Sequence, residues 1–192
     1  MIKICIETGW GNLLAELYDK QAPRTTAHFL TYVDEGHYDG ASIYRTARRD
    51  NVVPGLDGAM IEVIEGGYYN PYYENILRAG LAPGQVYEDE LAPKGTHPTI
   101  MVETTEETGI KHLDGVLSMG RTSPDMVDDC FFICVGNQPE LDYGGARSGD
   151  GLGFSAFGRI VSGMDLVRKI HKSPSQGQKL LEDVPVLRIY RV

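Results

Sequence analysis

The sequence has few cysteines, a deficit of basic residues and no long apolar run, and each of these features excludes a class of protein. Three cysteines among 192 residues are unlike the dense disulfide framework of a small secreted domain. Eighteen basic side chains stand against 27 acidic ones, and a net charge of −9 would repel a phosphate backbone, so we expect no nucleic-acid partner. No stretch approaches the roughly 20 apolar residues that span a membrane, so we expect no membrane partner.

Signals for export and for metal binding are missing as well. Residues 1–11 lack the charged-then-apolar layout of a signal peptide, so we expect a cytoplasmic protein, although a chain from which a leader had been removed would look the same. Cys130 and Cys134 are separated by three residues and have no histidine at a zinc-ligand spacing, which favours apolar strand residues over a metal site. We expect a monomer without metal or cofactor.

Hydrophobic periodicity predicts a mainly β protein. Residues 1–8 alternate, and a turn leads to a second strand at 12–18. Residues 22–36 change to a helical period behind Pro23, and a second helix is predicted at 162–171. Further strand patterns occupy residues 41–47, 60–64, 99–103, 115–120, 130–136, 154–161 and 184–192. About eight or nine short strands with two separated helices favour a closed antiparallel barrel or a sandwich.

The region of about residues 47–98 has the weakest pattern. Apart from the strand predicted at 60–64, it is rich in turn formers and tyrosines. We interpret it as a long irregular insertion in a single domain of residues 1–192. Loops of this length are uncommon in compact domains, and they tend to be functional or mobile.

Three arginines, Arg45, Arg48 and Arg49, lie close together at the start of this region. Alternation along the predicted strand places Arg45 on the same face as Ile43 and Ala47. Arg48 and Arg49 lie where the strand pattern ends. A guanidinium fixed on a strand is better preorganised for a ligand than one on a loop, although a strand arginine taken alone is more often an ion-pair partner.

The strand pattern that begins at Cys130 separates two neighbouring phenylalanines. Phe131 and Ile133 share one face, whereas Phe132 lies on the other face with Cys130. One ring is expected in the core and the other on the outer wall, where it would form an apolar pocket beside a strand arginine. The acidic residues within 125–129 lack the ligand spacing of a calcium loop, so a solvated loop is the favoured interpretation. No nucleophile–base set is evident.

These segments, in this order, resemble a cyclophilin-type peptidyl-prolyl isomerase of bacterial type. The segments that carry the resemblance are GNLLAELYDKQAPRTTAHFLTYVDEGHYDGASIYR, GVLSMGR, FFICVGNQPELD and FSAFGRIVSGMDLVRKI. They lie within residues 1–46 and 99–192, about three quarters of the chain. The resemblance implies an eight-stranded antiparallel β-barrel capped by two helices, with a groove for proline peptides on its outer wall.

The resemblance also implies which residues form the site. Arg45 matches the family's catalytic arginine, Phe132 the floor of the proline pocket and Leu141 its rim. Gly120 and Arg121 match the edge whose backbone binds the substrate peptide. The other substrate-binding positions are Val63, Glu65, Cys130 and Phe154.

The sequence departs from the family pattern around the arginine. Glu65 stands where the family has a glutamine, with Glu62 as a rival for that position. Ile43 and Tyr44 replace a Phe-His pair before Arg45. A carboxylate at Glu65 is able to ion-pair with Arg45 and hold the guanidinium away from substrate.

These features predict a peptidyl-prolyl cis-trans isomerase that acts in protein folding. Its substrates would be proline-containing peptides or unfolded protein chains, and the reaction requires neither a covalent intermediate nor a cofactor. The altered surroundings of Arg45 leave a second hypothesis open, a proline-peptide-binding module on the same barrel with weak or no turnover. A hydrolase built on the acidic loop is a third and weaker interpretation.

Overall fold

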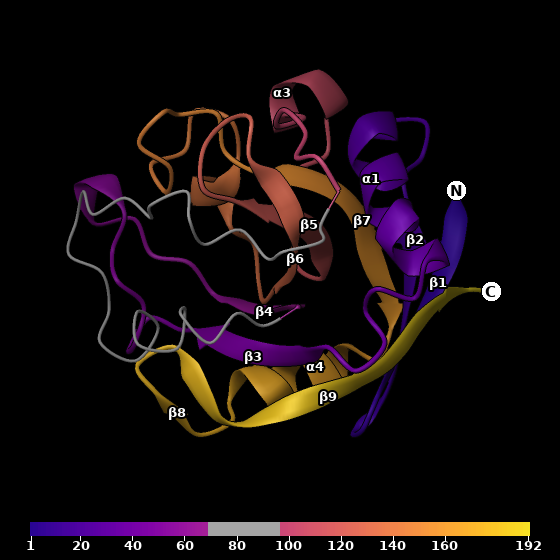
Figure 1. The fold of residues 1–192 in the computed structure, drawn as a ribbon. Helices are drawn as coiled ribbons and strands as arrows, with labels where there is room; N and C mark the ends of the chain where they lie inside the picture. The colour runs from indigo at the N-terminus through magenta and orange to yellow at the C-terminus, as the bar shows by residue number, and fades with distance from the viewer. Residues whose placement is uncertain (69–96) are drawn as a thin grey trace.

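The computed structural model describes residues 1–68 and 97–192, and its strands form one antiparallel sheet that closes on itself (Figure 1). The strands are β1 (Ile2–Thr8), β2 (Gly11–Leu17), β3 (Ser42–Ala47), β4 (Val63–Gly67), β5 (Val116–Arg121), β6 (Val127–Cys134), β7 (Ser155–Ser162), β8 (Ser175–Gln176) and β9 (Lys179–Arg191). The order in space is β1-β2-β7-β5-β6-β4-β3-β9, and β9 pairs again with β1. The short β8 pairs only with β9 and stands outside the ring. The predicted closed barrel of eight antiparallel strands is confirmed.

The ring closes through its first and last strands. Ile4 lies opposite Arg191 and Ile6 opposite Ile189. Strands β1 and β2 form the predicted hairpin, and the alternation of β1 places Ile4 and Ile6 in the core with no exposed surface. Every strand of the ring contributes apolar side chains to one continuous core.

Two of the described helices pack on the barrel at different places. Helix α1 (Pro23–Asp34) has Pro23 at its first position and lies against β7 and β9, where Phe29 contacts Phe131 and Phe157. Helix α4 (Met164–His171) lies against β2, β3 and β4. Three short elements complete the described secondary structure: α3 (Thr105–Thr108), η1 (Leu56–Gly58) and η3 (Pro139–Leu141). No helix of the described ranges is long and apolar enough to cross a membrane.

Some predicted boundaries were wrong. The strand expected at 99–103 is reduced to one bridge between Ile100 and Val127, because the backbone N–H of Val102 donates to Pro124 outside any ladder. The strand expected at 60–64 is β4, which begins and ends three residues later. The strand expected at 184–192 is the end of the longer β9. Most of the predicted irregular region of 47–98 lies outside the described residues, which include it only up to residue 68 and from 97.

Candidate active site

A β-bulge in β3 determines where the Arg45 side chain lies. In the ladder with β4, Ile43 lies opposite Gly66. The next pair is Arg45 and Glu65, so Tyr44 has no partner of its own. The extra residue breaks the alternation, and Ile43 joins the core while Arg45 turns to the other face. The prediction that Ile43 and Arg45 share a face is therefore wrong, because alternation holds only along an unbulged strand.

The ladders place three of the predicted site residues in one row across the barrel wall. Arg45 of β3 lies opposite Glu65 of β4, and Glu65 lies opposite Phe132 of β6. Ser118 of β5 extends the row on the far side of Phe132. Residues directly opposite one another project to the same face of a sheet. The cationic, acidic and aromatic groups therefore share the face opposite to that of Phe131.

The Arg45 guanidinium is held from two sides. Its Nη1 forms an ion pair with Oε2 of Glu65. Its Nε and Nη2 both donate to Oε1 of Gln178, at 3.0 and 2.7 Å. Glu65 also accepts a hydrogen bond of 3.0 Å from the hydroxyl of Tyr44. The side chains of the ion pair are only 15% and 14% exposed, so solvent screens this interaction weakly.

Tyr44 links this ion pair to Cys130. Its hydroxyl lies 3.2 Å from the Cys130 Sγ, and burial raises the pKa of both groups well above their ordinary values. Both groups are therefore neutral at physiological pH. Gly120 approaches the same thiol so closely that an added Cβ would lie 3.3 Å from it. The structure thus brings two predicted substrate-binding positions, Gly120 and Cys130, next to the Arg45–Glu65 pair.

The Phe132 ring is enclosed by two other rings. His112 stacks on it with the centroids 6.0 Å apart, and Phe154 meets it edge-on at 5.6 Å. Phe132 is only 4% exposed. Leu141 is buried beside Phe154, whose backbone N–H donates to the Leu141 carbonyl at 3.0 Å. Three predicted pocket residues therefore lie together, but the ring of Phe132 is nearly covered.

Sequence reasoning missed a buried polar chain beneath Phe132. The ring nitrogens of His112 lie 2.9 Å from Asp142 Oδ1 and 3.0 Å from Ser118 Oγ. Burial lowers the pKa of His112, so the imidazole is neutral at physiological pH. An Asp-His-Ser order is typical of hydrolases, but Ser118 and the His112 side chain have no exposed surface that a substrate could reach. These hydrogen-bonded side chains hold His112 against one face of the Phe132 ring.

Arg121 fastens a long loop beside Phe154, the ring that meets Phe132 edge-on. Its Nη1 and Nη2 donate to the two carboxylate oxygens of Asp150, each at 2.7 Å, and its Nε donates to the carbonyl of Gly153 at 2.7 Å. The side chain is 3% exposed and lies over the Phe154 ring at 5.2 Å. The guanidinium lowers the pKa of Asp150 to about 2. Arg121 therefore uses its side chain to hold the loop.

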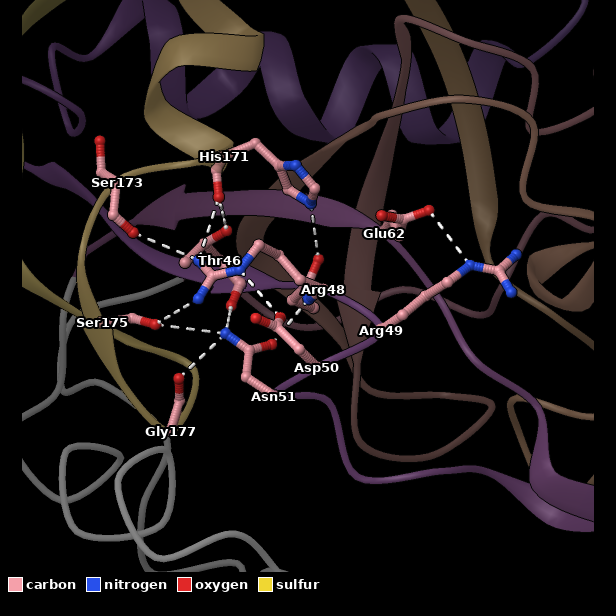
Figure 2. Close-up of polar contacts among 11 residues, drawn as sticks. Thr46, Arg48, Arg49, Asp50, Asn51, Glu62, His171, Ser173, Ser175 and Gly177 are labelled. Atoms are coloured by element: carbon pink, nitrogen blue, oxygen red, sulfur yellow. Dashed lines mark hydrogen bonds and ion pairs between the residues drawn. The ribbon is translucent and has the colours of Figure 1, made fainter.

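The start of the inserted region is tied to the barrel rather than loose. Figure 2 shows Arg48 and Asn51 reaching the last residue of α4, His171, and the residues that follow it. Arg49 lies apart, 77% exposed, with Glu62 at 3.5 Å. Glu62 is therefore the partner of Arg49, and Glu65 is the carboxylate beside Arg45.

Further along, the insertion lies against the loop that Arg121 holds. The backbone N–H of Leu56 donates to the carbonyl of Ala146 at 3.0 Å. Arg147 donates to the carbonyl of Val53 at 2.6 Å. The insertion and the loop after η3 therefore form one continuous rim on this side of the barrel.

The expectation of a solvated acidic loop was wrong for Asp128 and Asp129, which lie in β6, where Asp129 is only 2% exposed. Their contacts are also not those of a hydrolytic or calcium site. Asp129 pairs with His37 at 2.6 Å, and Asp128 accepts a hydrogen bond of 3.0 Å from the backbone of Cys130. Burial, together with the charge of Asp129, raises the pKa of Asp128 to about 7. Within residues 1–68 and 97–192, no cluster of histidine, cysteine and acidic side chains is arranged to bind a metal ion. Val63, a predicted substrate-binding residue, belongs to the core and is 1% exposed.

A closed eight-stranded barrel with an arginine and a phenylalanine in one row on its wall defines the class of the cyclophilin-like barrels. The family model described as "Cyclophilin type peptidyl-prolyl cis-trans isomerase/CLD" matches residues 3–191. The chain therefore belongs to the cyclophilin-type peptidyl-prolyl cis-trans isomerases, a family of isomerases that bind proline-containing peptides.

Relatives and solved structures agree with this assignment. Peptidyl-prolyl cis-trans isomerase A of Dickeya dadantii is 27% identical over 95% of this chain and 77% of its own length. Peptidyl-prolyl cis-trans isomerase B of Escherichia coli is 29% identical over 95% of this chain and 92% of its own. The fold is similar to that of a cyclophilin-type isomerase of Cryptosporidium parvum crystallised in the presence of the dipeptide Ala-Pro, with a TM-score of 0.67. That match covers 99% of this chain and 98% of the other at 18% identity.

Proposed function

We propose that this chain catalyses cis/trans exchange at Xaa-Pro bonds in peptides bound across β3, β4 and β6, with Arg45 as the catalytic residue. The observation that carries the proposal is the row of Arg45, Glu65 and Phe132 on one face of the barrel. Neighbouring strands are about 4.8 Å apart. A prolyl ring seated near Phe132 would thus lie two strands from β3, within the reach of a long arginine side chain.

The chemistry requires a group that binds the twisted bond better than either planar isomer. Rotation about an Xaa-Pro bond has a barrier of about 18–20 kcal/mol, because the planar amide is stabilised by resonance. Twisting localises a lone pair on the prolyl nitrogen. A guanidinium N–H from Arg45 donates to that nitrogen more strongly at the twisted state, and this differential interaction lowers the barrier. The backbone of Gly120 and Arg121 would hold one side of the peptide while the other side rotates.

The proposal extends to a cellular role. Substrates are exposed Xaa-Pro bonds in unfolded protein chains, so the enzyme would assist protein folding as a monomer. The cysteines Cys5, Cys130 and Cys134 are all free. Free thiols support a reducing compartment such as the cytoplasm. Size-exclusion chromatography with light scattering tests the monomer, and a dimer at micromolar concentration would contradict it.

Arg45→Lys tests the catalytic role. Lysine keeps the positive charge beside Glu65 but loses the planar fork of donors, whereas Arg45→Ala would leave a buried carboxylate unpaired. We expect kcat/KM for a proline peptide in a coupled cis/trans assay to fall about 100-fold, the loss typical of removing one preorganised donor. The melting temperature checks folding. Equal acceleration by wild type and Arg45→Lys would exclude Arg45 as the catalyst.

A second candidate function is a proline-peptide-binding module with weak turnover. It is favoured by the ion pair between Arg45 and Glu65 and by the near-complete burial of Phe132. Glu65→Gln, which gives this position the family's own residue, separates the two functions. Saturable binding of proline peptides by calorimetry, without acceleration of exchange in either wild type or Glu65→Gln, would select the binding module.

A further inference from the structure

We infer that Gln178 is a positioning residue for Arg45 and that the inserted segment sets its place through the β8–β9 hairpin. The inference rests on the proposed catalytic role of Arg45. Gln178 is not one of the residues that the family resemblance brought to the site.

Gln178 fixes the plane of the Arg45 guanidinium. Arginine has N–H donors and no acceptor, so the amide oxygen of Gln178 must face it, as the distances of 3.0 and 2.7 Å from Nε and Nη2 require. Glu65 holds the group from the Nη1 side. A contact at Nη1 does not by itself define the plane of the guanidinium. An acceptor on the Nε edge constrains that plane, which is the condition for preorganised donation.

The position of Gln178 is unusual for a turn residue. Gln176 of β8 pairs with Lys179 of β9, so Gly177 and Gln178 form a two-residue hairpin turn. Gly177 has a φ of +56°, which suits the first position of such a turn. Turn residues normally lie in solvent, but Gln178 is only 5% exposed. Its carbonyl accepts the backbone N–H of Thr46 at 2.9 Å, so the turn is bonded to the strand of Arg45.

Asn51 of the insertion holds this turn against β3 (Figure 2). Its Nδ2 donates to the carbonyls of Thr46 and Gly177, at 3.1 and 3.0 Å, and lies 3.3 Å from Ser175 Oγ. Its Oδ1 accepts the backbone N–H of Arg48 at 2.7 Å. One side chain thus connects the end of the arginine-bearing strand to the residue that precedes Gln178.

Arg48 strengthens the same connection from the other side of the hairpin (Figure 2). Its Nη2 donates to Ser175 Oγ at 3.0 Å, and its Nη1 to the carbonyls of His171 and Ser173 at 3.1 and 3.2 Å. The path from insertion to catalyst is therefore Arg48 and Asn51, then the hairpin, then Gln178 and Arg45. Arg49 is the adjacent residue outside this path.

Gln178→Leu tests the inference, because leucine has a similar size but no acceptor. We expect kcat to fall about 10-fold with KM changed less than about two-fold, since an interaction made only in the transition state is weakened. Gln178→Glu keeps an acceptor oxygen and should stay within about three-fold of wild type. The exchange rate of the Arg45 Nε–H, measured by NMR and assigned by its absence in Arg45→Lys, should rise at least about 10-fold in Gln178→Leu. General structural damage would instead raise the exchange rates of many N–H groups and change KM together with kcat.

A matched pair of variants, Asn51→Asp and Arg49→Ala, tests the contribution of the insertion. Asn51→Asp keeps the size and the Oδ1 acceptor but places a carboxylate oxygen against the carbonyls of Thr46 and Gly177, which accept and cannot donate. We therefore expect kcat to fall about three-fold. Arg49→Ala removes an exposed neighbour and should keep the wild-type kcat. In the Arg45→Lys background, Gln178→Leu should cause no further loss, because both changes act through the same guanidinium.

The outcomes separate the two proposals. An unchanged rate in Arg45→Lys overturns the catalytic role of Arg45 and, with it, any positioning for catalysis. A normal kcat or a normal Nε–H exchange rate in Gln178→Leu, when Arg45→Lys is impaired, overturns the positioning role alone. If Asn51→Asp and Arg49→Ala have the same kcat, the insertion has no part in the path.

Discussion

The two halves of the site are built by different forces. The Arg45 half (Tyr44, Arg45, Glu65 and Gln178) is a set of polar groups held by hydrogen bonds within the sheet and its hairpin. The Phe132 half (Phe132, His112, Phe154 and Arg121) is a stack of rings beside a loop that is fastened by a partly exposed ion pair of the buried Arg121 side chain. The Arg45 half orients the N–H donors of the guanidinium, whereas the Phe132 half buries apolar surface.

This difference indicates which property each half controls. Hydrogen bonds are directional and contribute about 1 kcal/mol each, so a loss in the Arg45 half should appear first in the rate. Apolar burial contributes in proportion to area, so a loss in the Phe132 half should appear first in the free energy of unfolding. Two variants test this division, and two more test how the free energy of unfolding around the site depends on pH.

Phe132→Ala should have the largest effect. It removes a ring that is 4% exposed and leaves a cavity between His112 and Phe154. We expect the free energy of unfolding, from urea titration, to fall by about 3–5 kcal/mol. Arg45→Lys, in the other half, should cost about 1 kcal/mol or less. A greater loss of stability in Arg45→Lys than in Phe132→Ala would contradict the division.

Arg121→Ala should come next, because it releases the loop and leaves Asp150 without its partner. We expect a loss of about 1–3 kcal/mol and faster proteolysis between Gly144 and Gly153. The control is Arg168→Ala, which breaks an ion pair whose side chains are 42% and 38% exposed and should cost about 0.5 kcal/mol or less. Equal losses in the two variants would mean that burial of the Arg121 pair has no energetic consequence.

Asp128 of β6, which belongs to neither half, makes the free energy of unfolding depend on pH. Its pKa of about 7 in the folded state is above the ordinary value of 3.8, so folding favours the protonated acid. Its contribution to stability is complete below about pH 4 and is lost as the pH rises through 7. Asp128→Asn should therefore raise the free energy of unfolding at pH 8 by at least about 1.4 kcal/mol, the value of one pKa unit, because the pKa is raised by more than one unit, and it should change little at pH 4. The same gain at both pH values would exclude this titration.

Asp150→Asn should have the smallest effect on the free energy of unfolding, and the pH dependence should have the opposite sign to that of Asp128. Its folded-state pKa of about 2 is below 3.8, so the contribution of the carboxylate is complete above about pH 4 and is lost as the pH falls through 2. Asp150→Asn should flatten this acid decrease, which is expected to be below about 1 kcal/mol for a partly exposed pair. Circular dichroism during acid titration measures it, and an unchanged slope would contradict the assignment.

Local patterns predicted much of the fold. Pro23 starts α1 as expected, and the alternation of β1 places Ile4 and Ile6 in the core, because these features depend on residues close in sequence. The face of Arg45 was predicted wrongly, since the bulge at Tyr44 depends on how two strands align. Boundaries near 99–103 failed for the same reason.

The site itself was predicted unevenly. Family resemblance assigned Phe132, Phe154 and Arg121 to one site, and the structure has these three side chains close together. The resemblance could not indicate that the Arg121 side chain would pair with Asp150. Gln178 carried no signal, because a residue after a turn glycine is normally expected in solvent. The connection of His112 to Asp142 also required the folded chain, since the two are 30 residues apart.

The pairing of β1 with β9 joins the first strand of the barrel to the last, so the barrel closes only when both are present. Until β9 has been synthesised, β1 keeps an open hydrogen-bonding edge. An open strand edge is able to pair with other chains, and contacts so distant in sequence slow folding. Nascent copies of this isomerase therefore pass through a stage in which they resemble the clients we propose for it, unfolded and exposed to aggregation.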